Sequence, residues 1–215
     1  MGTIKEDKRT KLHIAIVLDR SGSMHSIREA TVKAFNKQVE TLHKENKEDI
    51  DTRVSLITFS KFVDEPVFFD TPLKDLKKIT CENYVPYSAT ALNDSIGTTA
   101  FRLMDLEDYE ETKFLMISIT DGDENASIFL RQNKSGIKRF IKMLESNGNW
   151  TFTYLAANNP KEHFIKNYGA SKGNIKLFKA TDRGMQEAGD DISKGLTSFL
   201  SSVSSGESSV GDFWE

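Results

Sequence analysis

A chain of 215 residues is long enough to bury the core of one domain of ordinary size. Its 29 Lys and Arg residues nearly balance its 32 Asp and Glu residues, for a net charge of −3, which argues against sequence-independent binding to a nucleic-acid backbone. A single cysteine, Cys81, rules out an intramolecular disulfide. No apolar run approaches the roughly 18 residues of a membrane span, and the N-terminus lacks the apolar core of a signal peptide. We therefore expect a cytoplasmic protein that binds neither nucleic acid nor membrane.

The first predicted element is a strand over 12–19. Its almost continuous apolar run is typical of a strand buried on both faces in the centre of a parallel sheet. The run ends in Asp19, Ser21 and Ser23, on a short turn before a predicted helix over 24–42. A carboxylate and two hydroxyls therefore stand at the carboxyl edge of the predicted sheet, where open α/β sheets bind ligands.

Two segments rich in β-branched and aromatic residues follow, over 52–59 and 63–69. The connection between them is too short for a parallel crossover, which needs about a dozen residues, so an antiparallel hairpin is predicted. Pro66 has no N–H to donate to a neighbouring strand, which predicts that the second segment lies at the edge of the sheet.

The rest of the chain alternates helices and strands. We predict a helix or turn over 72–79, a helix behind Thr90, a strand over 113–120, a helix over 137–144, strands over 150–157 and 175–178, and a helix over 182–203. Such alternation implies a parallel sheet that helices cover on both faces. The predicted fold class is α/β, with a doubly wound, mostly parallel sheet and one antiparallel edge strand.

Three predicted loops carry oxygen donors. Asp19, Ser21 and Ser23 follow the first strand, Thr90 opens a helix, and Asp121 follows the strand over 113–120. If these two strands lie side by side, Asp19 and Asp121 meet in one crevice. Oxygen donors without a nearby cysteine suit Mg²⁺ or Mn²⁺. The alternative is that the serines are ordinary turn residues and that one caps the helix behind them.

The run Asp19-Arg20-Ser21-Gly22-Ser23 resembles the Asp-x-Ser-x-Ser signature of the von Willebrand factor type A (vWA) domain. Ser88-Ala89-Thr90-Ala91-Leu92 resembles its Gly-x-Thr-Ala-Leu turn, and Thr120-Asp121-Gly122 its Thr-Asp-Gly turn. The resemblance covers about 11–203 and is to the intracellular, bacterial or phage type. It implies a Rossmann-like fold and a metal-ion-dependent adhesion site (MIDAS) in which the ion is held, directly or through water, by Asp19, Ser21, Ser23, Thr90 and Asp121. Ser88 departs from the family's usual glycine, and we expect this to change the loop slightly and not the ligands.

The leading hypothesis for function is a non-catalytic, metal-dependent protein-interaction module, in which an Asp or Glu carboxylate of a partner displaces a water from the ion. The alternative is an adaptor subunit beside an AAA-type ATPase, as in metal chelatases, or in tellurium- or stress-resistance systems. The chain itself has no phosphate-binding Gly-x-x-x-x-Gly-Lys-Ser/Thr loop. A metal-dependent hydrolase is disfavoured, because His13, His43 and His163 lie away from the three loops. Arg20 and His25 flank the first loop, either as partner contacts or as plain exposed residues.

The predicted domain over 11–203 lies between a charged arm, 1–10, and a tail, 204–215. The tail is rich in serine and glycine and ends in aromatic residues between acids, the composition of a flexible linker with a small adhesive tip. One hypothesis is self-association, in which Asp212, Glu215 or the terminal carboxylate occupies the metal position of the same or another molecule and Phe213 and Trp214 pack beside it. A solvated tail is the alternative.

Overall fold

The computed structural model describes residues 9–130, 135–206 and 212–214. Of the predicted arm over 1–10, only the last two residues are described, and Thr10 already belongs to the first strand. The predicted tail over 204–215 is described at its two ends, where Ser204 closes the last helix and residues 212–214 pack against the domain. Residues 207–211 and 215 lie outside the described part of the chain.

In the described part of the chain, six strands form one sheet in the order β3-β2-β1-β4-β5-β6. Their bounds are β1 Thr10–Asp19, β2 Ile50–Phe59, β3 Phe68–Pro72, β4 Thr112–Thr120, β5 Trp150–Ala156 and β6 Ile175–Leu177. All neighbouring pairs are parallel except β2 and β3, which are antiparallel. β1 is central, as its apolar run predicts, and the predicted fold class is confirmed.

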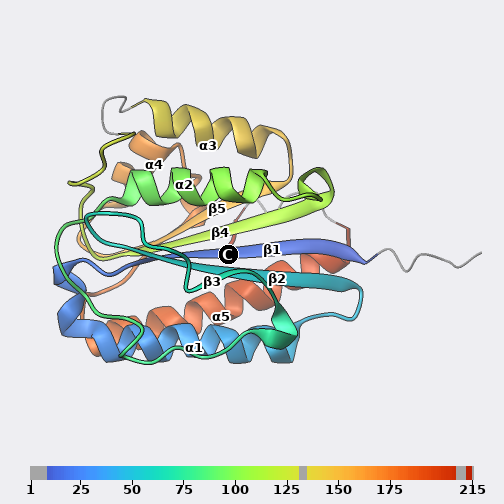
Figure 1. Cartoon of the computed structure of the whole chain (residues 1–215), viewed down its shortest axis with the longest axis horizontal. Coiled ribbons are helices and arrows are strands. Elements are labelled where there is room, and N and C mark those ends of the chain that lie inside the picture. The colour runs from blue at the N-terminus through green and yellow to red at the C-terminus, as the bar shows by residue number, and fades with distance from the viewer. Residues whose placement is uncertain (1–8, 131–134, 207–211, 215) are drawn as a thin grey trace, which may run out of the picture.

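Five α-helices cover the two faces of the sheet within the described residues (Figure 1). They are α1 Arg28–Glu45, α2 Leu92–Met104, α3 Gly136–Ser146, α4 Lys161–Tyr168 and α5 Asp182–Ser204. Helices α1 and α5 lie side by side below the sheet in this view, and α2, α3 and α4 lie above it. Each face of the sheet forms one apolar cluster with the helices on its side, so the site's strands are packed from both sides. No described helix combines the length and the apolar character of a membrane span.

The second strand of the edge hairpin begins later in the chain than predicted. Only an isolated bridge joins Val63 to Phe59, and β3 begins at Phe68. The intervening segment keeps two backbone hydrogen bonds to β2, from the Asp64 N–H to the Thr58 carbonyl at 3.0 Å and from the Val67 N–H to the Leu56 carbonyl at 2.9 Å. The Asp64 side chain also accepts a 2.8 Å hydrogen bond from the Thr58 hydroxyl and pairs with Arg20. Pro66, which cannot donate a backbone hydrogen bond, lies in the segment before β3 and not in the strand.

Two further differences concern helices. The predicted helix over 24–42 begins instead with a 3-10 turn, η1 Gly22–Ile27, before α1. The short helix α4 is not predicted at all: its eight residues bury only Phe164 and Tyr168, too few positions to show a helical period. Gly169 ends α4 with a φ of 72°, the left-handed conformation that glycine favours.

The sheet order places a topological switch point at the end of β1. From β1 the chain passes through α1 to β2 on one side, whereas β4 joins β1 on the other side. In open α/β sheets the two helices that follow such strands diverge, and ligands bind between them at the carboxyl ends. Asp19 ends β1, and Thr120 ends β4.

Candidate metal centre

The five predicted oxygen donors come together at the carboxyl ends of β1 and β4. Leu18 pairs with Ile119, so Asp19 and Thr120 are level across the two strands. The Ser23 hydroxyl donates a 2.6 Å hydrogen bond to Oδ1 of Asp121, which joins the first loop to the loop after β4. The Ser21 Oγ lies 3.2 Å from the Ser23 Oγ.

Thr90 faces the same point from a third loop. A Cβ placed on Gly122 would lie 3.4 Å from the Thr90 Oγ1 and 3.8 Å from the Ser23 Oγ. The Thr90 N–H donates a 2.9 Å hydrogen bond to the side-chain oxygen of Asn125, and the Asn125 N–H donates to the Thr90 carbonyl at 2.9 Å. The structure thus brings the predicted residues together, while their role as metal ligands stays a prediction.

Both carboxylates are buried without a counter-charge. Asp19 is 0% exposed and Asp121 is 2% exposed. Burial raises the pKa of Asp19 to about 6, against the opposing effect of hydrogen bonds from Thr120 and Ser21, and burial also raises the pKa of Asp121. Neither carboxylate forms an ion pair with a Lys, Arg or His among the described residues. Since an uncompensated buried charge is costly, this pair of carboxylates fits a bound cation.

The chemistry of the donors indicates which cation fits. Carboxylate and hydroxyl oxygens are ligands for hard divalent ions such as Mg²⁺ and Mn²⁺. The described residues contain no group of three or more His, Cys, Asp and Glu side chains that could hold a metal ion. The two carboxylates alone would not complete the coordination shell of an ion. The remaining ligands would have to be water or the hydroxyls of Ser21, Ser23 and Thr90.

Three residues that the sequence analysis did not assign to the site support it. The Thr120 hydroxyl donates a 2.6 Å hydrogen bond to Oδ2 of Asp19, and the buried Tyr84 hydroxyl donates to the Asp19 carbonyl. The Asn158 side chain donates a 2.6 Å hydrogen bond to the Asp121 carbonyl, from a backbone with a φ of 61°. Thr120 stands in the Thr-Asp-Gly match and could have been identified from it, whereas Tyr84 and Asn158 carry no such signal.

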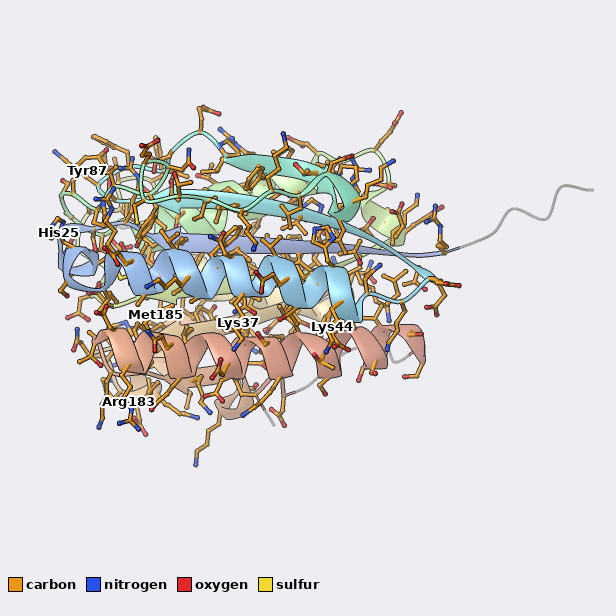
Figure 2. The ribbon with its side chains drawn as sticks, turned by 90° about the horizontal axis from the view of Figure 1, so that it is seen from below. His25, Lys37, Lys44, Tyr87, Arg183 and Met185 are labelled. Atoms are coloured by element: carbon orange, nitrogen blue, oxygen red, sulfur yellow. The ribbon has the colours of Figure 1, made fainter. Side chains whose placement is uncertain are left out.

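Arg20 is fixed in place beside the site. Its guanidinium pairs with both carboxylate oxygens of Asp64 and lies 4.3 Å from the centroid of the Tyr87 ring. His25 is exposed on η1 and lies at the same end of the molecule as Tyr87 (Figure 2).

Ser88 takes the backbone conformation that a glycine would favour, with a φ of 67°. Its carbonyl accepts a 2.9 Å hydrogen bond from the Gly22 N–H, which ties the Thr90 loop to the loop after β1. The Tyr87 N–H donates to the Arg20 carbonyl at 2.8 Å beside it. Although serine replaces the usual glycine at this position, the turn keeps the positive φ that glycine favours.

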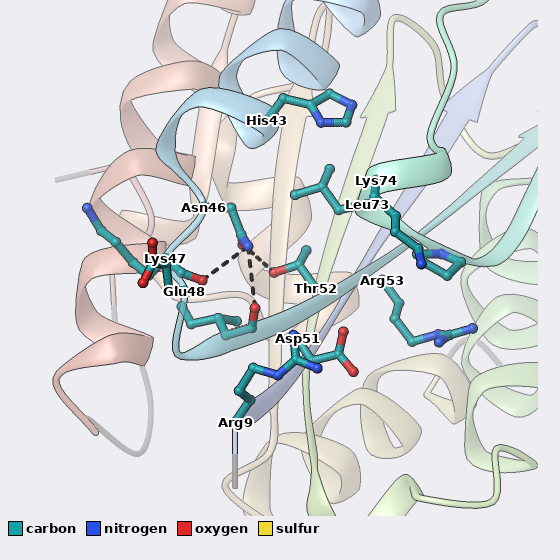
Figure 3. A pocket seen from close by; sticks show the side chains of 12 residues that line it. Arg9, His43, Asn46, Lys47, Glu48, Asp51, Thr52, Arg53, Leu73 and Lys74 are labelled. Carbon is teal, nitrogen blue, oxygen red and sulfur yellow. Dashed lines mark hydrogen bonds between the residues drawn. The ribbon is translucent and has the colours of Figure 1, made fainter. Parts of the chain in front are cut away.

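A pocket of about 470 Å³ lies at the opposite edge of the sheet, among Asn46, Thr52 and Arg53 (Figure 3). β1 is ten residues long, so this edge is about 30 Å from Asp19. Polar groups in the pocket bond one another: the Thr52 hydroxyl donates to the side-chain oxygen of Asn46 at 2.6 Å. The pocket is separate from the candidate metal centre.

No protein-family model and no curated protein matches the sequence. Solved structures do resemble the fold. Proximal thread matrix protein 1 (PTMP1) from the mussel byssus, with a zinc-occupied MIDAS motif, has a TM-score of 0.61 and 16% identity over 88% of this chain and 46% of its own. The chain thus spans less than half of the length of PTMP1.

Two further structures are similar. The VWA domain of SpRpn10 has a TM-score of 0.56 and 15% identity over 81% of this chain and 92% of its own. Manganese-loaded TRAP protein of Plasmodium vivax has a TM-score of 0.52 and 16% identity over 86% of this chain and 72% of its own. Identities this low establish the architecture alone. The chain therefore has the Rossmann-like fold of vWA domains.

Proposed function

We propose that the chain is a non-catalytic protein-interaction module that binds a divalent cation, Mg²⁺ or Mn²⁺, at Asp19, Ser21, Ser23, Thr90 and Asp121. The observation that carries the proposal is the pair of buried carboxylates that lack a cationic side-chain partner among the described residues. When bound, the ion supplies a coordination position that the Asp or Glu of a partner protein can occupy. Zinc in the MIDAS motif of PTMP1 and manganese in TRAP support a divalent ion on this fold.

The chain's own residues orient the donors. The two oxygens of Asp19 are held by different groups, Oδ1 by the Ser21 N–H at 2.7 Å and Oδ2 by the Thr120 hydroxyl at 2.6 Å. Asn158 holds the backbone of Asp121. Hydrogen bonds of this kind fix carboxylate ligands and raise metal affinity.

An apolar rim on the neighbouring loops supports a protein partner. Phe62 is 56% exposed, Val85 49% and Tyr87 47%. Backbone hydrogen bonds connect these loops to the site: Tyr87 N–H to the Arg20 carbonyl at 2.8 Å, and Ala91 N–H to the Ser60 carbonyl at 2.8 Å. Aromatic and apolar side chains of this kind supply contact area in protein interfaces, while one charged contact fixes the register.

The proposal includes no catalytic step. The base that activates a serine nucleophile is most often a histidine. Among the described residues, the Ser21 and Ser23 hydroxyls hydrogen-bond each other, the Ser23 hydroxyl also donates to Asp121, and no histidine hydrogen-bonds either hydroxyl. These contacts suit hydroxyls that serve as ligands.

Metal binding is tested by thermal unfolding with and without Mg²⁺, Mn²⁺ or Zn²⁺. An ion present at about 100 times its Kd stabilises the folded state by about 2.7 kcal/mol, which raises the Tm of a domain of this size by roughly 5–10 °C. Asp19→Ala should abolish the shift, whereas Asp123→Ala, which removes an exposed carboxylate from the same loop as Asp121, should keep it. Equal shifts in both variants would show that the ion binds elsewhere.

Partner binding is tested by affinity capture from lysate in Mg²⁺ and in excess chelator, with Asp19→Ala and Asp123→Ala as the paired baits. We expect a protein that is captured by the wild type and by Asp123→Ala and lost with chelator or Asp19→Ala. Identification of that protein also tests whether the partner is an AAA-type ATPase. Capture that is indifferent to chelator would contradict the proposal.

A further inference from the structure

Residues 212–214, which we call the tip, pack against α5 and the turn before β6, and none of these contacts is with a donor of the candidate metal centre. Phe213 is 2% exposed and belongs to the apolar cluster of α1 and α5. Its N–H donates a 2.8 Å hydrogen bond to the side-chain oxygen of Asn174, and the Trp214 N–H donates to the Gly173 carbonyl at 3.1 Å. The hypothesis that the tip binds at the metal position is therefore not what this structure shows.

Two glycines make room for the tip. A Cβ on Gly195, in the middle of α5, would lie 2.5 Å from the Phe213 ring, and its three nearest atoms all belong to Phe213. A Cβ on Gly173 would lie 2.0 Å from the carboxylate of Asp212. Glycine inside a helix costs stability relative to alanine, so its use at Gly195 is explained by the ring that occupies the space. We call the surface formed by Gly173, Asn174, Gly195 and Phe199 the tip slot; the rings of Phe199 and Phe213 are 6.2 Å apart.

The tip is not packed as completely as the core. A cavity of about 270 Å³ remains beside it, between Lys176, Lys194 and Trp214. The indole N–H of Trp214 is buried and has no acceptor among the described residues. An unsatisfied buried donor weakens the contact. The slot also borders β6, the edge strand of the sheet, where a second molecule can approach.

We propose that the tip slot is a peptide-binding site that accepts the tip of a second copy of this chain in exchange for its own. A second copy carries the one segment whose fit to the slot is shown by the structure. Seven residues, 205–211, join α5 to the tip and can span up to about 25 Å, enough for the tip to reach its own slot or that of an adjacent molecule. Because the connection is short, the chain's own tip has an effective concentration at the slot in the millimolar range. The tip of a second copy can therefore bind only at high protein concentration or when a slot has lost its own tip.

Two full-length variants test the tip and the tip slot separately. Phe213→Ala leaves the slot open and removes the ring, whereas the double variant Gly195→Ala/Gly173→Ala keeps the tip and closes the slot at two points. Neither variant can pair with itself through the slot. A mixture of the two should form a heterodimer by sedimentation velocity, while each alone stays monomeric.

A synthetic peptide of residues 207–215 provides the second readout. It should raise the Tm of Phe213→Ala, and the same peptide with alanine at position 213 should bind roughly 10- to 100-fold more weakly, the effect expected for burial of one phenylalanine ring. The closed-slot variant should bind neither peptide. A monomeric mixture, or equal binding of the two peptides to Phe213→Ala, would overturn the proposal.

Discussion

The hydroxyl of Thr120 donates a 2.6 Å hydrogen bond to Oδ2 of Asp19 and so ties the end of β4 to the end of β1. The other carboxylate oxygen accepts the N–H of Ser21 at 2.7 Å. Both oxygens of Asp19 are thus oriented by the protein alone. We regard Thr120 as a positioning residue, which acts on a bound ion through Asp19.

Thr120→Val tests this role, because valine has nearly the same shape and lacks the hydroxyl. We expect affinity for Mg²⁺ or Mn²⁺ to fall about 10-fold, the usual cost of losing a hydrogen bond to a ligand. The free energy of unfolding should fall by about 1–2 kcal/mol. Calorimetric titration and denaturant unfolding measure the two effects.

Thr153→Val is the matched control. Thr153 is buried on the neighbouring strand β5, and its hydroxyl donates a 3.1 Å hydrogen bond to the Asn174 carbonyl, away from the metal donors. It should lose a similar amount of stability with no change in metal affinity. A comparable loss of affinity in both variants would mean that Thr120 acts only through general stability.

The central strand and the order of elements were predictable because the signals are local. The apolar run that ends at Asp19 identifies a strand buried on both faces, and the alternation of helices and strands implies the parallel sheet. The antiparallel edge strand was predicted, but it begins at Phe68 and not at position 63. Asp64, in the segment before it, pairs with Arg20, a contact that spans 44 residues of sequence. Such tertiary contacts leave no periodic trace.

In the candidate site, too, some residues were predictable from the sequence and others were not. The donors from Asp19 to Asp121 lie in short motifs and could be predicted, whereas their support comes from distant positions. Tyr84 reaches the Asp19 carbonyl across 65 positions, and Asn158 reaches the Asp121 carbonyl across 37. Neither a tyrosine nor an asparagine at such spacing indicates a metal site, so only the folded structure identifies them.

Ser88→Gly should stabilise the protein. Ser88 has a φ of 67°, and a side chain in this left-handed region costs about 1–2 kcal/mol. Glycine removes this cost, but its greater conformational entropy in the unfolded chain offsets part of the gain. We expect a net gain of about 1 kcal/mol in the free energy of unfolding, measured by denaturant, with metal affinity unchanged. Ser205→Gly, at a φ of −74°, should instead lose about 0.5–1 kcal/mol, and equal effects in both variants would contradict the argument.

Asp19→Asn should separate stability from metal binding. Burial raises the pKa of Asp19 from 3.8 to about 6, so the ionised carboxylate costs the metal-free fold up to about 3 kcal/mol at neutral pH. Asparagine removes the charge and nearly keeps the shape; its oxygen can accept from the Ser21 N–H, and its NH₂ group can donate to the Thr120 hydroxyl, which is able to rotate. We expect the metal-free variant to resist denaturant better than wild type and to gain nothing from added Mg²⁺. A metal-free variant less stable than the wild type would contradict this account of the buried charge.

His13 makes folding stability sensitive to pH. It is 1% exposed in the middle of β1, and its Nε2 lies 2.8 Å from the Ser55 hydroxyl. Its Nδ1 lies 3.5 Å from Oδ1 of Asp70, but that carboxylate already pairs with Arg53 at 2.6 Å. Burial, and next the charge of Arg53, lower the pKa of His13 from 6.5 to about 3, so the folded protein keeps this side chain neutral.

The sign of the effect follows from proton binding. Between pH 6.5 and about pH 3 the unfolded chain protonates His13 and the folded chain does not, so acid favours unfolding. The free energy of unfolding is not reduced by His13 above pH 6.5. As the pH falls below 6.5, His13 lowers the free energy of unfolding by at most about 1.4 kcal/mol per pH unit. His13→Gln, which can still bond Ser55, should flatten the dependence of unfolding free energy on pH in this range, measured by denaturant titration. Parallel slopes for His13→Gln and wild type would show that His13 is protonated in the folded state, which the burial and the nearby guanidinium oppose.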